Sequence, residues 1–328
     1  MRLCHSRQRC NPEHNYTLPF GLDRSVRRLT LLTATVVLAG LGLPAHTEAA
    51  YPGKPGRIVF VHGFDDAEGN EVSSLRTVAP NGKRRSGLGS CRAGRGCSDE
   101  HPTYSPKGRL LAFNASFSRI VISRADGSQR RTLQLPDAHR NPSHPTWSPD
   151  GRRLAFDMSL NEPEPGSEAT RSIVTAKTDG TDLRTVTSGE YDRSPAWSTG
   201  GQIAFNRGAG EYPDIFTVDP QTGIEKRVAE GLSPTWAPDG VRLAFTRGLI
   251  PEDQSLVVLN TKTGKQRTFK QARNPFNPAW SPDGRYIVYA CQSGICKIAV
   301  STGRATLVAR ERGSSVFDAP DWQPLSGR

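Results

Sequence analysis

Short apolar runs alternate with polar turns from about residue 57 to the end of the chain. One example is residues 153–157 (RLAFD), which a Pro-Asp-Gly turn precedes. Runs rich in Val, Ile, Leu and Phe between turn-forming residues are typical of short strands. The 32 Gly and 25 Pro agree with many turns, and the 35% of hydrophobic residues is enough for a core. The pattern therefore predicts an all-β protein.

One phrase recurs six times in this region. A Pro stands two residues before an aromatic residue, and a Ser-Pro-Asp-Gly-like turn and an apolar run follow. The aromatic residues are Tyr104, Trp147, Trp197, Trp236, Trp280 and Trp322, at separations of 43, 50, 39, 44 and 42 residues. All five Trp of the chain occupy this position, so we interpret them as packing residues. A period of this length indicates a repeat architecture.

Each repeat carries the signals of four strands. The turn joins a first strand, which holds the aromatic residue, to the apolar second strand. A third strand, such as 171–177, and a fourth, such as 182–188, follow across a second Asp-Gly or Thr-Gly turn. Four antiparallel strands in about 40 residues describe one blade of a β-propeller.

The two ends of the repeat region complete each other. The last phrase stops after its first strand, whereas residues 57–64 form a second strand with no first strand before it. Joining them closes the ring and removes the free sheet edges. The second strands are expected at 58–60, 110–113, 154–156, 203–205, 243–245 and 287–289, which predicts six blades.

The phrase P-x-W-S-P-D-G-x-x-[LI]-A-F resembles the WD40-like repeat of the TolB family. The resemblance covers about residues 57–328 and implies a six-bladed propeller. Nothing upstream is similar to the small α/β domain that precedes the propeller of TolB itself, so a role in the Tol-Pal system does not carry over.

Residues 1–50 differ from the rest and are expected to be a leader. Two arginines precede an apolar run at about 29–43, and small residues precede Tyr51, which is the layout of a secretory signal peptide. The run is shorter than the ~20 residues of a membrane span, so no stable span is expected after cleavage. The polar stretch before the run is long, and one hypothesis places the true start at Val26. The propeller domain is then 51–328, in an exported protein of the periplasm, the cell envelope or the extracellular space.

Four cysteines lie beyond the leader in two close pairs, Cys91 with Cys97 and Cys291 with Cys296. Two local disulfides in an oxidising compartment explain this arrangement. A four-cysteine zinc site is the alternative, but structural zinc usually takes closer spacings.

Strand order in a meander places the tight turns on one face and the second-to-third loops and blade links on the other. The long loops at 134–144, 157–170, 206–214 and 246–255 share the latter, which we call the variable-loop face. We expect this face to bind a partner and the opposite face, the turn face, to support the ring.

Candidate binding residues lie where the first strands enter from the variable-loop face. His101 and His144 both precede the Pro of their repeats and should be neighbours near the channel mouth. The candidates are His101, His144, Asp192, Arg193, Asn277 and Asp318. Two histidines with Asp192 or Asp318 could hold a metal, but we favour rim residues because two ligands do not make a site. The turn residues Asp150, Asp239 and Asp283 are interpreted as turn caps and not as calcium ligands.

Several enzyme classes lack their motifs. The chain has no G-x-S-x-G, no Walker loop and no G-x-G-x-x-G after a strand. The net charge of +11 suits an acidic partner, although arginines spread through every repeat also fit a generally basic surface. We expect a monomeric, non-catalytic scaffold without a cofactor that binds a protein or glycan of the cell envelope, and no nucleic acid. The alternative is a metal-dependent lyase or hydrolase acting at the channel mouth.

Overall fold

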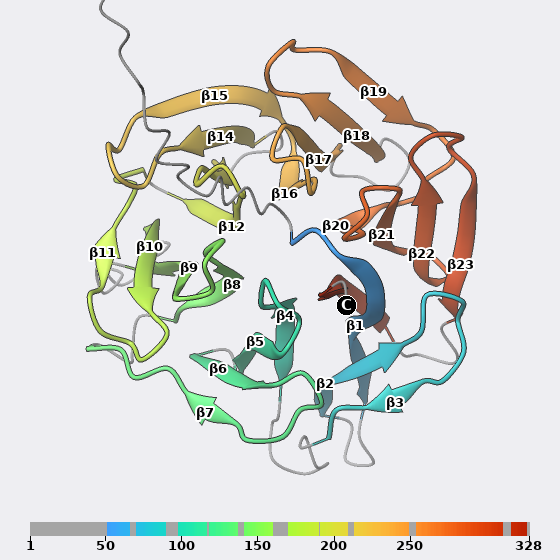
Figure 1. Ribbon diagram of the computed structural model, residues 1–328, viewed down its shortest axis with the longest axis horizontal. Helices are drawn as coiled ribbons and strands as arrows, with labels where there is room; N and C mark the ends of the chain where they lie inside the picture. Colours follow the sequence, from blue (N-terminus) through green and yellow to red (C-terminus); the bar gives the residue numbers. More distant parts are fainter. Residues whose placement is uncertain are drawn as a thin grey trace, which may run out of the picture. The chain divides into compact units, whose positions relative to one another are not determined.

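A computed structural model describes residues 51–65, 70–89, 98–116, 118–136, 141–159, 170–189, 191–208, 213–248, 254–310 and 316–326. Every regular element in these ranges is a β-strand. The strands form six four-stranded antiparallel sheets arranged as blades around a central channel (Figure 1). The predicted six-bladed propeller is confirmed.

The strands fall into four sets by their place in the blade, counted outward from the channel. The first strands are β24 (Val316–Leu325), β4 (Asp99–Tyr104), β8 (Ser143–Trp147), β12 (Asp192–Trp197), β16 (Leu232–Trp236) and β20 (Phe276–Trp280). The second strands are β1 (Lys54–Asp65), β5 (Leu110–Ala115), β9 (Arg153–Ser159), β13 (Ile203–Arg207), β17 (Arg242–Arg247) and β21 (Tyr286–Cys291). The third strands are β2 (Glu71–Val78), β6 (Arg119–Arg124), β10 (Arg171–Lys177), β14 (Asp214–Val218), β18 (Ser255–Asn260) and β22 (Gly294–Ala299). The outermost strands are β3 (Ser86–Gly87), β7 (Arg131–Thr132), β11 (Arg184–Thr185), β15 (Glu225–Glu230), β19 (Gln266–Phe269) and β23 (Ala305–Arg310). In this order they make blades 1 to 6.

Blade 1 closes the ring in the predicted way. Its strand order is β24-β1-β2-β3, so the last strand of the propeller pairs antiparallel with the first. Trp322 lies opposite Ile58, and Asp318 lies opposite Val61. The pairing leaves neither terminal strand as a free inner edge.

The core consists of six clusters, and each lies between two neighbouring blades. Trp147 is fully buried between Ile122 of blade 2 and Phe156 of its own blade. The repeated aromatic residue is therefore a wedge between blades, and burying such a side chain contributes about 2–3 kcal/mol. The interface between blades 3 and 4 is thinner, with five buried apolar residues against eight to eleven at the other five interfaces.

Turn aspartates cap their own turns. Oδ1 of Asp150 accepts a hydrogen bond from Arg152 N at 3.0 Å, and Oδ1 of Asp239 accepts one from Val241 N at 2.9 Å. The Pro-Asp-Gly turns thus use the Asp side chain for local geometry.

The expected leader, with its apolar run at 29–43 and the hypothetical start at Val26, lies outside the described residues. Within the described ranges, no helix is long and apolar enough to cross a membrane.

Candidate functional site at the channel mouth

A β-bulge in each first strand shapes the mouth of the channel. Pairing with the second strand shifts register around the residue that precedes the shared Pro, as in β4, β8 and β12. These residues all have positive φ, between 42° and 53°: His101, His144, Ser194, Ser233, Asn277 and Ala319. A bulge re-aims the side chain, and all six residues line one recess. Because Ala319 shares the conformation, the geometry belongs to the repeat and the side chains supply the chemistry.

Polar side chains from the preceding blade hold the bulges of β8 and β12. Asn114, near the end of β5, donates a hydrogen bond from Nδ2 to Pro142 O at 2.6 Å and accepts one from His144 N at 3.0 Å. The equivalent residue of the next blade, Asp157 on β9, accepts a hydrogen bond from Ser194 N at 3.3 Å. The bulges at His144 and Ser194 are therefore each fixed by a buried group of the preceding blade, which keeps these two mouth residues in place.

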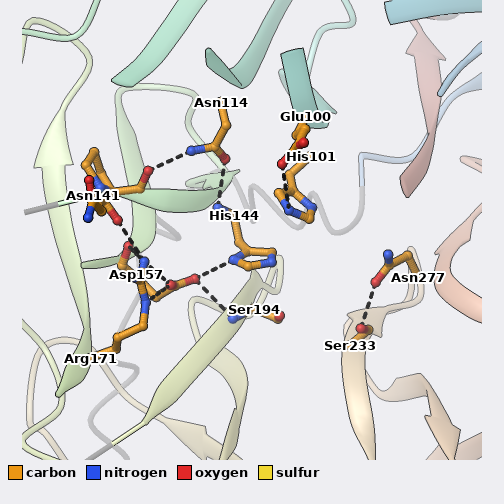
Figure 2. A network of polar contacts seen from close by, with 11 residues as sticks. Glu100, His101, Asn114, Asn141, His144, Asp157, Arg171, Ser194, Ser233 and Asn277 are labelled. Atoms are coloured by element: carbon orange, nitrogen blue, oxygen red, sulfur yellow. Dashed lines mark hydrogen bonds and ion pairs between the residues drawn. The ribbon is translucent and has the colours of Figure 1, made fainter. Parts of the chain in front are cut away.

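His144 is the best-oriented side chain at the mouth. Its Nδ1 lies 2.7 Å from Oδ1 of Asp157, and Arg171 Nε donates to the other carboxylate oxygen at 2.6 Å (Figure 2). Burial alone would raise the pKa of Asp157, but His144 and Arg171 hold it below its usual value. An ionised carboxylate only accepts, so Nδ1 of His144 carries the proton. Nε2 is then the group left to meet a ligand, as a hydrogen-bond acceptor, base or metal ligand.

His101 lies against His144, with the two ring centroids 3.9 Å apart. Burial, with the charge of the neighbouring His144, lowers the pKa of His101 to about 3. His101 is thus neutral near pH 7, and its 4.0 Å approach to Glu100 is not an ion pair under those conditions. His101 therefore presents a neutral, polarizable ring to the recess beside His144.

The opposite side of the mouth carries amide and hydroxyl groups that already pair with each other. Ser233 Oγ donates to Asn277 Oδ1 at 2.8 Å, and Asn277 Nδ2 donates to Asp318 Oδ1 at 2.9 Å. Figure 2 shows Ser233 and Asn277 lying across from the histidine pair. The mouth is therefore asymmetric, with imidazoles on one side and a satisfied polar chain on the other.

The recess at the mouth has a volume of about 150 Å³. Sites that enclose a small organic molecule usually have about 300–1,000 Å³. The recess suits one inserted side chain, one sugar substituent or a few waters, and a larger partner has to rest on the surrounding loops.

Two further sequence candidates lie elsewhere. Asp192 is fully buried, and its carboxylate accepts hydrogen bonds from Arg207 Nε at 2.6 Å and Nη2 at 2.9 Å. Its side chain therefore does not line the recess. Arg193 is exposed and does not line the recess either. In the part of the chain that the structure describes, no three His, Cys, Asp or Glu side chains are grouped to hold a metal ion. The histidine pair therefore has no third protein ligand there.

The predicted cysteine pairs have different outcomes. Cys291 and Cys296 form a disulfide across the β21–β22 hairpin, with Cα atoms 5.9 Å apart. Cys91 and Cys97 lie outside the described residues.

Sequence reasoning missed Asp157, Ser194 and Asp321. Aligning the repeats on the shared Pro would have found Ser194, because it occupies the place of His101. Asp321 lies two residues deeper in the channel than Ala319 and accepts a hydrogen bond from Tyr104 N at 2.6 Å. Burial raises the pKa of Asp321 to about 6 despite hydrogen bonds that lower it.

Comparison with known proteins agrees with this architecture. The family model of the TolB beta propeller domain matches residues 100–325, so the chain belongs to this family of propellers. TolB from Acinetobacter baumannii is 19% identical, with a TM-score of 0.66 over 82% of this chain and 67% of that one. A chain of a nidogen/laminin complex is 11% identical, with a TM-score of 0.66 over 83% of this chain and 100% of that one. An oligogalacturonate lyase from Vibrio parahaemolyticus is 11% identical, with a TM-score of 0.56 over 82% and 79%. At these identities the likeness concerns the fold.

Proposed function

We propose that this chain is an exported, non-catalytic propeller that binds a protein or glycan of the cell envelope at its variable-loop face. One observation carries the proposal: the channel mouth combines a shared bulge with side chains that differ from blade to blade. A repeated backbone with varied side chains is how a rigid scaffold presents a specific surface. The mouth is too small to enclose a substrate, so it serves as the anchor point for one group of a larger partner.

Three further features support export and binding. The disulfide between Cys291 and Cys296 fits an oxidising compartment. Among the similar structures, one is a TolB and another comes from a complex of two proteins. The excess of basic residues favours an acidic partner and raises its encounter rate at low salt.

The test is site-specific crosslinking in the exporting cell. A photoreactive amino acid replaces Asn277 at the mouth, and in a matched strain it replaces Lys262, which is exposed on the turn face. We expect a discrete adduct only from position 277, and we expect it to disappear when His101→Ala and His144→Ala are added. Equal adducts from both positions, or none from position 277 in any envelope fraction, would refute the proposal.

A second candidate function rests on the oriented His144–Asp157 pair. A histidine whose Nδ1 is held by a buried carboxylate has the arrangement of a general base, and one similar structure is an oligogalacturonate lyase. The described residues supply no third ligand for a metal-dependent version. Elemental analysis of the purified full chain and of its His101→Ala, His144→Ala variant tests for bound metal. Incubation with oligogalacturonate, followed by ultraviolet absorbance of an unsaturated product, tests for elimination. Turnover that the double variant lacks would replace the binding proposal.

A further inference from the structure

A cavity on the turn face lies between blades 3 and 4, apart from the channel mouth. Its volume is about 360 Å³, more than twice that of the recess at the mouth and within the range of small-ligand sites. The tight turns of both blades form its walls. The side chains that matter for its chemistry are Trp197, Asp150, Arg153, Arg184 and Gln221.

The cavity arises from a local departure from the repeat. Trp197 is six residues before its partner Ile203, whereas Trp147 is seven residues before Leu154, so the blade 4 turn is one residue shorter. The sequence of that turn is Ser-Thr-Gly-Gly, without the Pro that the other full turns carry. Four of the five Trp side chains are at most 4% exposed, and Trp197 is the partly exposed one. The interface is also the one with the smallest core cluster.

Trp197 also lacks the side chain that covers the equivalent Trp in other blades. In blade 5, Arg242 lies over the ring of Trp280 in the next blade, 4.8 Å from its centroid, and Tyr286 similarly approaches Trp322 at 6.3 Å. Arg153 holds the equivalent position before Trp197. Its Nη1 instead lies 2.7 Å from Asp182 Oδ2. Arg153 therefore faces its own blade, and Trp197 faces the cavity.

The polar groups around the cavity have spare hydrogen-bonding capacity. Arg184 is 67% exposed, and within the described ranges only its Nε is engaged, by Asp182 at 2.8 Å. Asp150 uses Oδ1 for Ser148 and Arg152, which leaves Oδ2 without a described partner. The side-chain amide of Gln221 has none among the described residues either. The guanidinium of Arg184, the carboxylate of Asp150 and the amide of Gln221 thus lie around the partly exposed indole of Trp197.

We propose that this cavity binds a pyranose ring of a glycan. The C–H faces of a sugar ring are apolar and pack on an indole, while its hydroxyls need donors and acceptors at the rim. Asp150 and Gln221 accept from hydroxyls, and Arg184 donates to a hydroxyl or to a uronate carboxylate. The negative charges of Asp150 and Asp182 offset the positive charges of Arg153 and Arg184. The cavity therefore has no strong positive potential to attract a polyphosphate, which favours a sugar ring. The site is independent of the proposed partner at the mouth.

Binding is measured on the full chain by calorimetry and by tryptophan fluorescence, because Trp197 is the Trp nearest to solvent. The probes are maltohexaose, chitotetraose and oligogalacturonate. We expect at least one to bind and to change the fluorescence. We also expect Arg184→Ala and Trp197→Phe each to weaken it at least tenfold. Lys262→Ala, on the same face in blade 5, should bind as the parent does, and thermal melts verify that every variant is folded.

The outcomes separate the alternatives. Binding of oligogalacturonate alone, weakened by salt and lost in Arg184→Ala, assigns the ligand as a uronate. Binding of a neutral oligosaccharide that depends on Trp197 assigns a neutral ring. If none of the three binds, or if binding is unchanged in both cavity variants, the inference is wrong and the cavity is a packing gap.

Discussion

Replacing Asp321 by Asn should make the propeller more stable at neutral pH. The Asp321 carboxyl lies in the channel, and the described residues offer it no cationic partner. Burial raises its pKa from 3.8 to about 6. Asn keeps one oxygen to accept from Tyr104 N and removes the charge. It also replaces one accepting oxygen by an NH2 group, so the comparison between two pH values, and not the stability at one pH, isolates the contribution of the charge.

The sign and size follow from proton linkage. The folded state binds the Asp321 proton more tightly than the unfolded state, so its contribution to stability is fully present below about pH 4 and is lost as pH rises through 6. Each pH unit corresponds to about 1.4 kcal/mol, which gives at most about 3 kcal/mol across this window. The difference in unfolding free energy between Asp321→Asn and the parent should therefore rise in favour of the variant by up to about 3 kcal/mol from pH 4 to pH 8.

Urea unfolding of the full chain, followed by circular dichroism at pH 4 and pH 8, measures this gain. Asp65→Asn is the control, because Asp65 is exposed at the end of β1. The gain should be absent there. If the parent and Asp321→Asn show the same change in unfolding free energy between the two pH values, the carboxyl is not buried as described.

Three other changes test the packing of the ring. Gly180 has φ of +91°, and a Cβ there would lie 1.8 Å from Gln134 O of blade 2; Gly180→Ala should lose at least about 2 kcal/mol in urea unfolding, and a parent-like midpoint would contradict the close approach. Asp157→Asn removes the charge that compensates Arg171 and accepts from His144, and it should lose about 3 kcal/mol at pH 7. A loss below about 1 kcal/mol by the same measurement would show that the network is not coupled to folding. Replacing Cys291 and Cys296 by Ser opens a loop with a sequence separation of only 5, so calorimetry should show a loss of about 2 kcal/mol or less, and a much larger loss would mean that the bridge does more than close its hairpin.

The fold was predictable because its signals are local and repeated. The aromatic wedge, the turn and the apolar second strand recur with a period near 40, and the unmatched strands at the ends required a closed ring. Closure also made the neighbourhood of His101 and His144 predictable, since equivalent residues of successive blades must meet at the channel.

The details of the site depended on features that no short pattern encodes. The bulge before the shared Pro interrupts the strand alternation, so Asp192, two residues earlier, faces the blade interior and Arg207. The partner of His144 comes from the end of β9, and only the register between first and second strands brings Asp157 there. Trp197 is open to the cavity because Arg153 pairs with Asp182 instead of covering the Trp197 ring. Both partners are near Arg153, and the sequence does not show which of them it contacts.

The pairing of β24 with β1 also bears on how the protein is made. Blades 2 to 6 are each continuous in the chain, so they can form in the order of synthesis. Blade 1 needs the first and the last strand of the propeller together. The ring therefore closes only once β24 has emerged from the ribosome, or from a translocation pore if the chain is exported unfolded. Until then the inner edge of β1 and the face of blade 6 that packs against blade 1 are exposed, which makes this interval the one in which a chaperone matters most.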